Sequence, residues 1–260
     1  MLDKAIIQDI GETLFRCLCD QTVIPPLTET YPSINLTDAY QISQVLLAKR
    51  IDAGETVIGK KIGATSRAVQ EMLGVFEPDF GFLTDAMWAQ DGLVHTDGLI
   101  APRAEAEIGF RLHKSLQGPG VTANDVLAAA ASVVACFEIV DSRIRDWKIK
   151  LEDTVADNAS CGVFVLSDDE ISPQGLDLSA MKVIVEKNGH YLSEGLGSAV
   201  QGAPENAIAW LANTLGEFGI PFNAGEIVLS GSLVPLEPAV AGDHFQMTIE
   251  GLGQCEAHFI

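Results

Sequence analysis

Apolar residues near the N-terminus recur at helical spacing. Residues 2–19 place them on one face of a 3.6-residue repeat, which predicts an amphipathic helix. A second helix is expected to begin at a cap formed by Thr37 or Asp38 and to run to about Ala53. Residues 1–60 are therefore predicted to form a small helical N-terminal part.

Beyond this part the pattern is typical of strands. Val57 begins a strand, and Thr65 or Ser66 is expected to cap a short helix that ends at Gly74. Further strands are expected at residues 105–112, 133–140, 161–166, 181–187, 190–193, 226–230, 244–249 and 254–260. The dipeptide Asn188-Gly189 between two of them predicts a hairpin.

Two helices are expected to interrupt these strands. One follows Thr122, where Asp125 completes a capping box. The other begins at Pro204, a favoured first-turn residue, and ends at Gly219. The order of elements predicts an α+β fold with mostly antiparallel strands, in which residues 61–260 form a β-rich catalytic body.

Composition and charge narrow the class of protein. Hydrophobic residues make up 47% of the chain, which is sufficient for a large core. A net charge of −20 repels phosphate backbones and anionic lipids, so nucleic acid and membranes are poor partners. An anionic substrate would need a local positive focus, such as a metal, Lys or Arg.

Targeting signals and cysteines point to a cytoplasmic protein. No secretory pattern opens the chain, and its five cysteines lie mostly in apolar runs, which predicts free thiols in a reducing cytoplasm. The longest apolar run, residues 126–137, is too short to span a bilayer. It is expected in the core or at an interface.

Two carboxylates two residues apart form the first candidate site. Glu105 and Glu107 would point to one face of a strand, and Glu138 lies in another apolar run. Buried carboxylates repel each other unless a cation or a shared proton neutralises them. Three carboxylates without nearby His or Cys indicate Mg²⁺ or Mn²⁺. The alternative is an exposed strand face, with Arg103 and Arg111 as surface partners.

Two lysines and an aspartate supply further candidates. Lys60 and Lys61 lie between glycines at residues 59–63, and in a strand one faces in and the other out. The inward lysine would hold a substrate carboxylate or carry a proton with a lowered pKa; otherwise both are solvated. Asp79 lies in the turn-like segment 78–81, as a turn acceptor or as a catalytic acid/base.

Small polar residues form two further segments of interest. Residues 153–162 are expected to be a site wall or a hydrogen-bonded loop, and Ser160 has neither a nearby His nor the motif of a nucleophile. Ser230 and Gly231 follow an apolar run and would present backbone N–H groups to an anion or form a plain turn. The five histidines are scattered, and no His-based triad or zinc motif is visible.

Four ordered segments together resemble one family. They are residues 59–66, 73–81, 102–107 and 141–160. They resemble the 2-oxopent-4-enoate (2-hydroxypenta-2,4-dienoate) hydratases of aromatic meta-cleavage pathways, in the hydratase/decarboxylase branch of the fumarylacetoacetate hydrolase superfamily. The resemblance covers nearly the whole chain. It implies a mixed β-sandwich roll with a small helical N-terminal part.

The resemblance also implies roles for individual residues. These are Glu105, Glu107 and Glu138 as ligands of Mg²⁺ or Mn²⁺, Lys61 as the active-site lysine, Asp79 as the acid/base, and Ser160 as a polar substrate contact. We add Ser230 and Gly231 as candidate substrate contacts, from their position after a strand.

The implied reaction adds water to a small anionic dienoate, 2-hydroxypenta-2,4-dienoate, and gives 4-hydroxy-2-oxopentanoate. The related 4-oxalocrotonate decarboxylases share the fold and the three carboxylates, but they typically read G-x-K-M-G and lack the P-D-F-G found at residues 78–81. Hydrolase members use a Glu–His pair, and H-x-x-E does not occur here.

Two alternatives remain: decarboxylation, and an inactive metal-binding structural partner. The family further implies homo-oligomers and association with the decarboxylase.

Overall fold

A computed structural model describes residues 1–66, 70 and 77–260. The short helix expected between Thr65 and Gly74 falls largely outside the described residues. Among the residues that are described, no helix is long and apolar enough to cross a membrane.

Three helices form the N-terminal part. They are α1 (Lys4–Asp20), α2 (Leu27–Thr30) and α3 (Leu36–Asp52). The expected cap of α3 at Thr37 or Asp38 is wrong: the Asn35 side chain accepts from the Asp38 N–H, and the Asp38 carboxylate accepts from the Asn35 N–H. Both predicted helices are otherwise confirmed.

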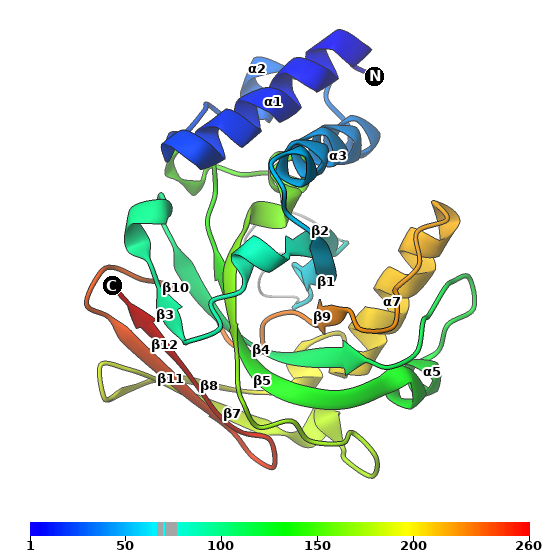
Figure 1. The fold of residues 1–260 in the computed structure, drawn as a ribbon, viewed down its shortest axis with the longest axis vertical. Coiled ribbons are helices and arrows are strands. Elements are labelled where there is room, and N and C mark those ends of the chain that lie inside the picture. The colour runs from blue at the N-terminus through cyan, green and yellow to red at the C-terminus, as the bar shows by residue number, and fades with distance from the viewer. Residues whose placement is uncertain (67–69, 71–76) are drawn as a thin grey trace.

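The N-terminal helices lie at one end of the molecule, above the sheets (Figure 1). Their apolar faces form one cluster, which also contains Ile144, Val155 and Ala156 from later in the chain. The division between residues 1–60 and 61–260 stays a prediction.

Within the described residues the body contains two sheets. The seven-stranded sheet consists of β1 (Val57–Gly63), β2 (Asp79–Thr84), β4 (Arg103–Leu112), β5 (Ala130–Val140), β6 (Cys161–Leu166), β9 (Ile227–Leu229) and β10 (Glu237–Pro238). Its order is β2-β1-β9-β4-β5-β6, with β10 beside β4. The five-stranded sheet consists of β3 (Leu93–Val94), β7 (Lys182–Lys187), β8 (His190–Leu196), β11 (His244–Ile249) and β12 (Gly253–Phe259).

The long strands β4 and β5 curl against the five-stranded sheet (Figure 1). Side chains of both sheets share one apolar core, in which the Phe137 and Phe245 rings meet edge to face with centroids 6.1 Å apart. The strands are mostly antiparallel, but β1 pairs in parallel with β9 and β3 with β12. The expected mixed β-sandwich roll is confirmed.

Three further described helices lie between these strands along the chain. They are α5 (Ala123–Ala129), α6 (Leu151–Ala156) and α7 (Pro204–Glu217). The capping box of Thr122 with Asp125 and the start at Pro204 are confirmed. Short 3₁₀ turns cover 85–87, 96–98, 145–147, 158–160, 178–180 and 197–199.

Strand predictions succeeded where the apolar runs are long. Strands β7 and β8 form the predicted hairpin, and Asn188 and Gly189 have the positive φ values, 56° and 75°, that a type I′ turn requires. Most of the run 126–137 is buried in the core, although Ala128 and Ala131 are exposed. The turn expected at 78–81 is wrong, because residues from Asp79 onward form β2, which pairs antiparallel with β1. The two-residue strands β3 and β10 are too short to show a periodicity.

Candidate active site

The pairing of β4 with β5 assembles three carboxylates on one face. Glu105 lies directly opposite Glu138, and Glu107 lies two residues further along β4, opposite Cys136. All three side chains are buried: Glu105 is 8% exposed, Glu138 is 1% exposed and Glu107 is 0% exposed. One oxygen from each lies within 4.8 Å of the others. The prediction that these residues come together is confirmed.

This cluster is electrostatically strained without a cation. Burial and the charge of Glu138 raise the pKa of Glu105 to about 8, and burial also raises the pKa values of Glu107 and Glu138. Glu107 Oε1 and Glu138 Oε2 are buried and accept no hydrogen bond from the described part of the chain. Glu107 Oε2 accepts from the Gly231 N–H at 2.8 Å.

The donor set therefore fits a hard divalent ion. Three carboxylates supply oxygen ligands and negative charge, and two buried oxygens lack another partner. Mg²⁺ and Mn²⁺ prefer such oxygen donors.

Lys61 lies beside this cluster. Its Nζ is 3.2 Å from Glu138 Oε1, and the residue is 2% exposed. Burial alone would lower the pKa of Lys61, but the charges of Glu138, Asp79 and Glu105 outweigh it and raise this pKa. The charges around Lys61 therefore favour its protonated form, and the role of Lys61 as a proton carrier stays a prediction.

The neighbouring Lys60 has a different environment. It points to the other side of β1, yet it is also only 2% exposed, so the expected solvated lysine is wrong. Its Nζ pairs with Glu226 and lies 5.1 Å from the centroid of the Phe222 ring. A partner 166 residues away explains the burial of this second charge.

Asp79 reaches the site from β2, opposite Gly63 of β1. A Cβ on Gly63 would collide with Asp79 Oδ1 and would lie 3.3 Å from Lys61 Nζ. Asp79 Oδ2 accepts from Thr154 Oγ1 at 3.2 Å. Burial raises the pKa of Asp79, and the charge of Lys61 opposes that rise.

A strained turn brings Ser160 to the same place. Asn158, Ala159 and Ser160 have φ values of 54°, 51° and 52°, a left-handed conformation that side chains disfavour. The Asn158 side chain holds the turn by bonding to both the N–H and the C=O of Phe82, at 2.9 and 3.0 Å. Ser160 Oγ lies 3.4 Å from Thr154 Oγ1.

Below this turn, Arg143 is fully buried. It donates to the Asp157 carboxylate at 2.6 Å and to the Asp157 and Cys161 carbonyls. This buried pair fixes both ends of the strained turn.

A cavity of about 260 Å³ connects these groups. Lys61, Asp79, Glu105 and Ser160 line it, as predicted for a common site. Ser230 and Gly231 are not among its lining residues; Ser230 Oγ is buried without a hydrogen-bond partner among the described residues. Their proposed contact with substrate stays a prediction.

Arg103 and Trp147 also line the cavity, although sequence reasoning assigned neither to the site. Thr154 lies within residues 153–162, which were expected to form a site wall. The Arg103 guanidinium lies 4.6 Å from the centroid of the Trp147 ring. Arg103 could have been found, because it precedes Glu105 by two residues and shares its strand face. No comparable pattern pointed to Trp147, which lies in a short turn with a positive φ of 55°.

The chain is similar to known proteins in both sequence and structure. The model of the family described as fumarylacetoacetate (FAA) hydrolase C-terminal matches residues 63–260. A 2-hydroxyhexa-2,4-dienoate hydratase of Comamonas testosteroni is 58% identical over 100% of this chain and 99% of its own length. A 2-hydroxypent-2,4-dienoate hydratase of Pseudomonas putida is 56% identical over 84% of this chain and 100% of its own.

Among solved structures, a 4-oxalocrotonate decarboxylase from Pseudomonas putida G7, complexed with magnesium and adipate, superposes with a TM-score of 0.96. It is 33% identical, and the match covers 100% of this chain and 99% of that one.

Proposed function

The chain belongs to the fumarylacetoacetate hydrolase family, and we propose that it is a divalent-metal-dependent hydratase of this family. It adds water to 2-hydroxypenta-2,4-dienoate and gives 4-hydroxy-2-oxopentanoate, a step of aromatic meta-cleavage catabolism. Two dienoate hydratases that are 58% and 56% identical to it support this reaction.

One observation carries the proposal: the buried carboxylate cluster opens through Glu105 into a cavity that also holds Lys61 and Asp79. Glu105, Glu107 and Glu138 would hold the metal. A bound Mg²⁺ or Mn²⁺ would neutralise the cluster and act as a Lewis acid on the oxygens of an anionic substrate. This local positive charge offsets the overall charge of −20.

The chain's own residues would then move protons. The dienol loses its hydroxyl proton and gains one at C5, and water afterwards gives its hydroxyl to C4 and a proton to C3. Asp79 is our candidate for proton transfer, because its carboxylate lies in the cavity with Lys61 and accepts from Thr154, and because burial raises its pKa and so favours the proton-bound form. Lys61 would place its ammonium group beside the glutamate cluster and stabilise negative charge on the substrate oxygens.

Ser160 would complete the site as a substrate contact. Its hydroxyl lies in the cavity next to Thr154, which also donates to Asp79. A substrate oxygen that bonds to Ser160 would therefore lie close to the proposed acid/base. The strained turn holds this hydroxyl in place before substrate binds.

Decarboxylation of 4-oxalocrotonate is the second candidate, which the TM-score of 0.96 to a decarboxylase favours. Sequence identity favours the hydratase, since the decarboxylase is only 33% identical. The test offers both compounds to one preparation with Mg²⁺. The hydratase removes dienoate absorbance and forms 4-hydroxy-2-oxopentanoate without release of CO₂. Release of CO₂ from 4-oxalocrotonate, with the dienoate unchanged, would reverse the assignment.

The finer properties belong to the same proposal. Mn²⁺ is expected to replace Mg²⁺, because both take oxygen ligands. Five free cysteines support a cytoplasmic location. The family resemblance supports a homo-oligomer and a complex with 4-oxalocrotonate decarboxylase, which size-exclusion chromatography with light scattering would test.

A further inference from the structure

Two neighbouring strands place three metal-binding side chains on one face of the five-stranded sheet. In the antiparallel pairing of β11 with β12, His244 lies opposite His258, and Glu256 precedes His258 by two residues. Residues two apart in a strand share a face. The alternate residues Phe245 and Ala257 are fully buried, so the three side chains lie on the outer face, where they are between 36% and 44% exposed.

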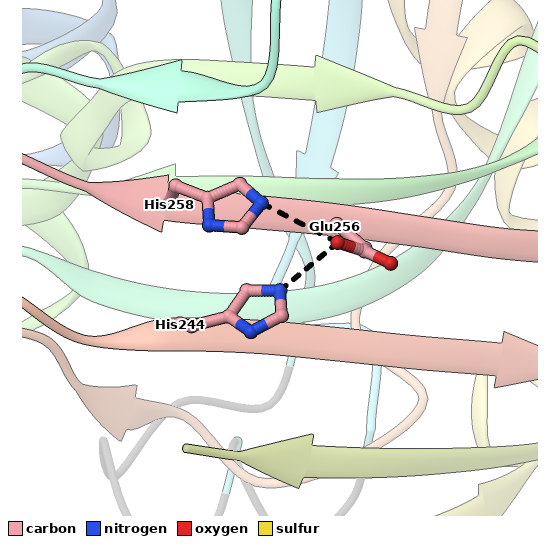
Figure 2. Close-up of side chains that lie close together, drawn as sticks. All are labelled: His244, Glu256 and His258. Atoms are coloured by element: carbon pink, nitrogen blue, oxygen red, sulfur yellow. Dashed lines mark hydrogen bonds and ion pairs between the residues drawn. The ribbon is translucent and has the colours of Figure 1, made fainter. Parts of the chain in front are cut away.

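The three side chains converge on one point (Figure 2). Nε2 of His244 and Nε2 of His258 lie 3.1 and 3.3 Å from the same oxygen of Glu256. The imidazole rings are stacked, with centroids 4.1 Å apart and planes 5° apart. Zinc bonds of about 2.0–2.2 Å separate the ligand atoms of a tetrahedral site by roughly 3.3–3.6 Å. The two N···O distances are close to this spacing, and the stacked rings must rotate before both nitrogens face one ion.

The donor atoms differ from those of the glutamate cluster in the active site. Two imidazole nitrogens and one carboxylate oxygen suit Zn²⁺, Ni²⁺ or Cu²⁺ better than Mg²⁺. Gln246 Nε2 donates to the other oxygen of Glu256 at 3.0 Å, which orients the carboxylate as outer partners orient metal ligands. Partial exposure leaves positions for water in the coordination sphere.

We propose that His244, Glu256 and His258 form a second divalent-cation site, which takes Zn²⁺ or a transition metal of similar preference. The ion would join β11 to β12 and so fasten the C-terminal strand to its sheet. Because the unfolded chain does not hold the three ligands together, binding stabilises the folded state. The site has no part in the proposed hydration of the dienoate.

Zn²⁺ itself is the probe, and calorimetry on the full-length protein in the presence of Mg²⁺ measures its binding. The matched variants are His258→Gln at the new site and Glu107→Gln at the active site. We expect the wild type and Glu107→Gln to bind Zn²⁺ at this site and to gain Tm with it. His258→Gln should bind at least about tenfold more weakly, since even an outer partner of a metal is worth ~10–100-fold in affinity.

Hydratase activity with Mg²⁺ should be unchanged in His258→Gln, which shows that this variant folds; if it does not fold, His244→Gln takes its place. The thiol of Cys19 is exposed, so Cys19→Ser serves as a further control. Zn²⁺ binding that survives loss of either histidine, or that disappears in Cys19→Ser, would overturn the proposal.

Discussion

Gly63 and Asp79 face each other across β1 and β2, and the Asp79 carboxylate occupies the space that any Cβ at Gly63 would need. Asp79, the proposed acid/base, therefore reaches the side of Lys61 only because residue 63 has no side chain. The glycine in β1 therefore determines where the carboxylate of Asp79 in β2 can lie.

Gly63→Ala should consequently inactivate the protein without unfolding it. The added methyl displaces Asp79, so we expect kcat to fall about 10²–10⁴-fold, the usual contribution of a general acid/base. Steady-state kinetics and circular dichroism provide the measurement. Gly98→Ala is the matched control, because a Cβ there meets no atom within 4 Å. Full activity in Gly63→Ala would show that the position of Asp79 is not critical.

Substitutions of the two adjacent lysines should affect different properties: Lys61→Met the reaction rate, and Lys60→Met the stability of the fold. Lys61→Met removes the charge beside the glutamate cluster, and we expect a rate loss of about 10²–10³-fold, the usual cost of losing one electrostatic stabiliser of the transition state. Lys60→Met breaks the buried pair with Glu226 instead, which should cost ~3–5 kcal/mol of unfolding free energy. Urea unfolding and kinetics on both variants distinguish the two effects. A Lys60→Met variant that is fully folded and yet has lost turnover would contradict this account.

The glutamate cluster should make the metal-free protein less stable as pH rises. The folded pKa of Glu105, about 8, lies above its ordinary value of 4.5. A raised folded pKa stabilises the fold below the unfolded value, and this contribution is lost as pH rises through the folded value. In EDTA, the Tm of the wild type should fall relative to Glu105→Gln between about pH 4.5 and 8, as calorimetry can measure.

Added Mg²⁺ should raise the wild-type Tm most at the upper end of this window, where protons no longer compete for the carboxylates. A difference in Tm between wild type and Glu105→Gln that stays constant with pH would contradict the raised pKa of Glu105.

Ser160→Gly should lower activity while it relieves backbone strain at this position. Glycine accepts the φ of 52° without penalty, so the stability of the variant should not fall. Loss of a hydroxyl that bonds a charged substrate costs ~1.5–3 kcal/mol of binding, and kcat/KM should therefore fall about 10–150-fold. Ala159→Gly is the matched control, because its φ of 51° is relieved equally and no hydroxyl is lost. Equal kcat/KM in both variants would remove Ser160 from the substrate site.

The periodic pattern predicted the fold well where elements are long. The helices α1 and α3 and the strands β4 and β5 follow from their own apolar spacing. Strand β2 was missed, because Pro78-Asp79 is typical of a turn, and only its pairing with β1 makes it a strand.

The residues of the candidate site could be predicted from the sequence, but the contacts around them could not. Glu105 and Glu107 share a face by sequence alone, whereas their meeting with Glu138 depends on the register of β4 and β5. The burial of Lys60 depends on Glu226, and no local pattern reveals such a distant partner. For the same reason the scattered histidines gave no sign that His244 and His258 stack across β11 and β12.

The most direct test of the central claim follows dienoate absorbance after EDTA treatment and return of Mg²⁺, in wild type and in Glu107→Gln. Glu107 is fully buried, and one of its oxygens has no partner among the described residues, so its main role should be to bind the metal. We predict that EDTA abolishes turnover by the wild type, that Mg²⁺ restores it, and that Glu107→Gln regains little activity at the same Mg²⁺ concentration. Full turnover in EDTA, or a Glu107→Gln variant that responds to Mg²⁺ as the wild type does, would contradict the account.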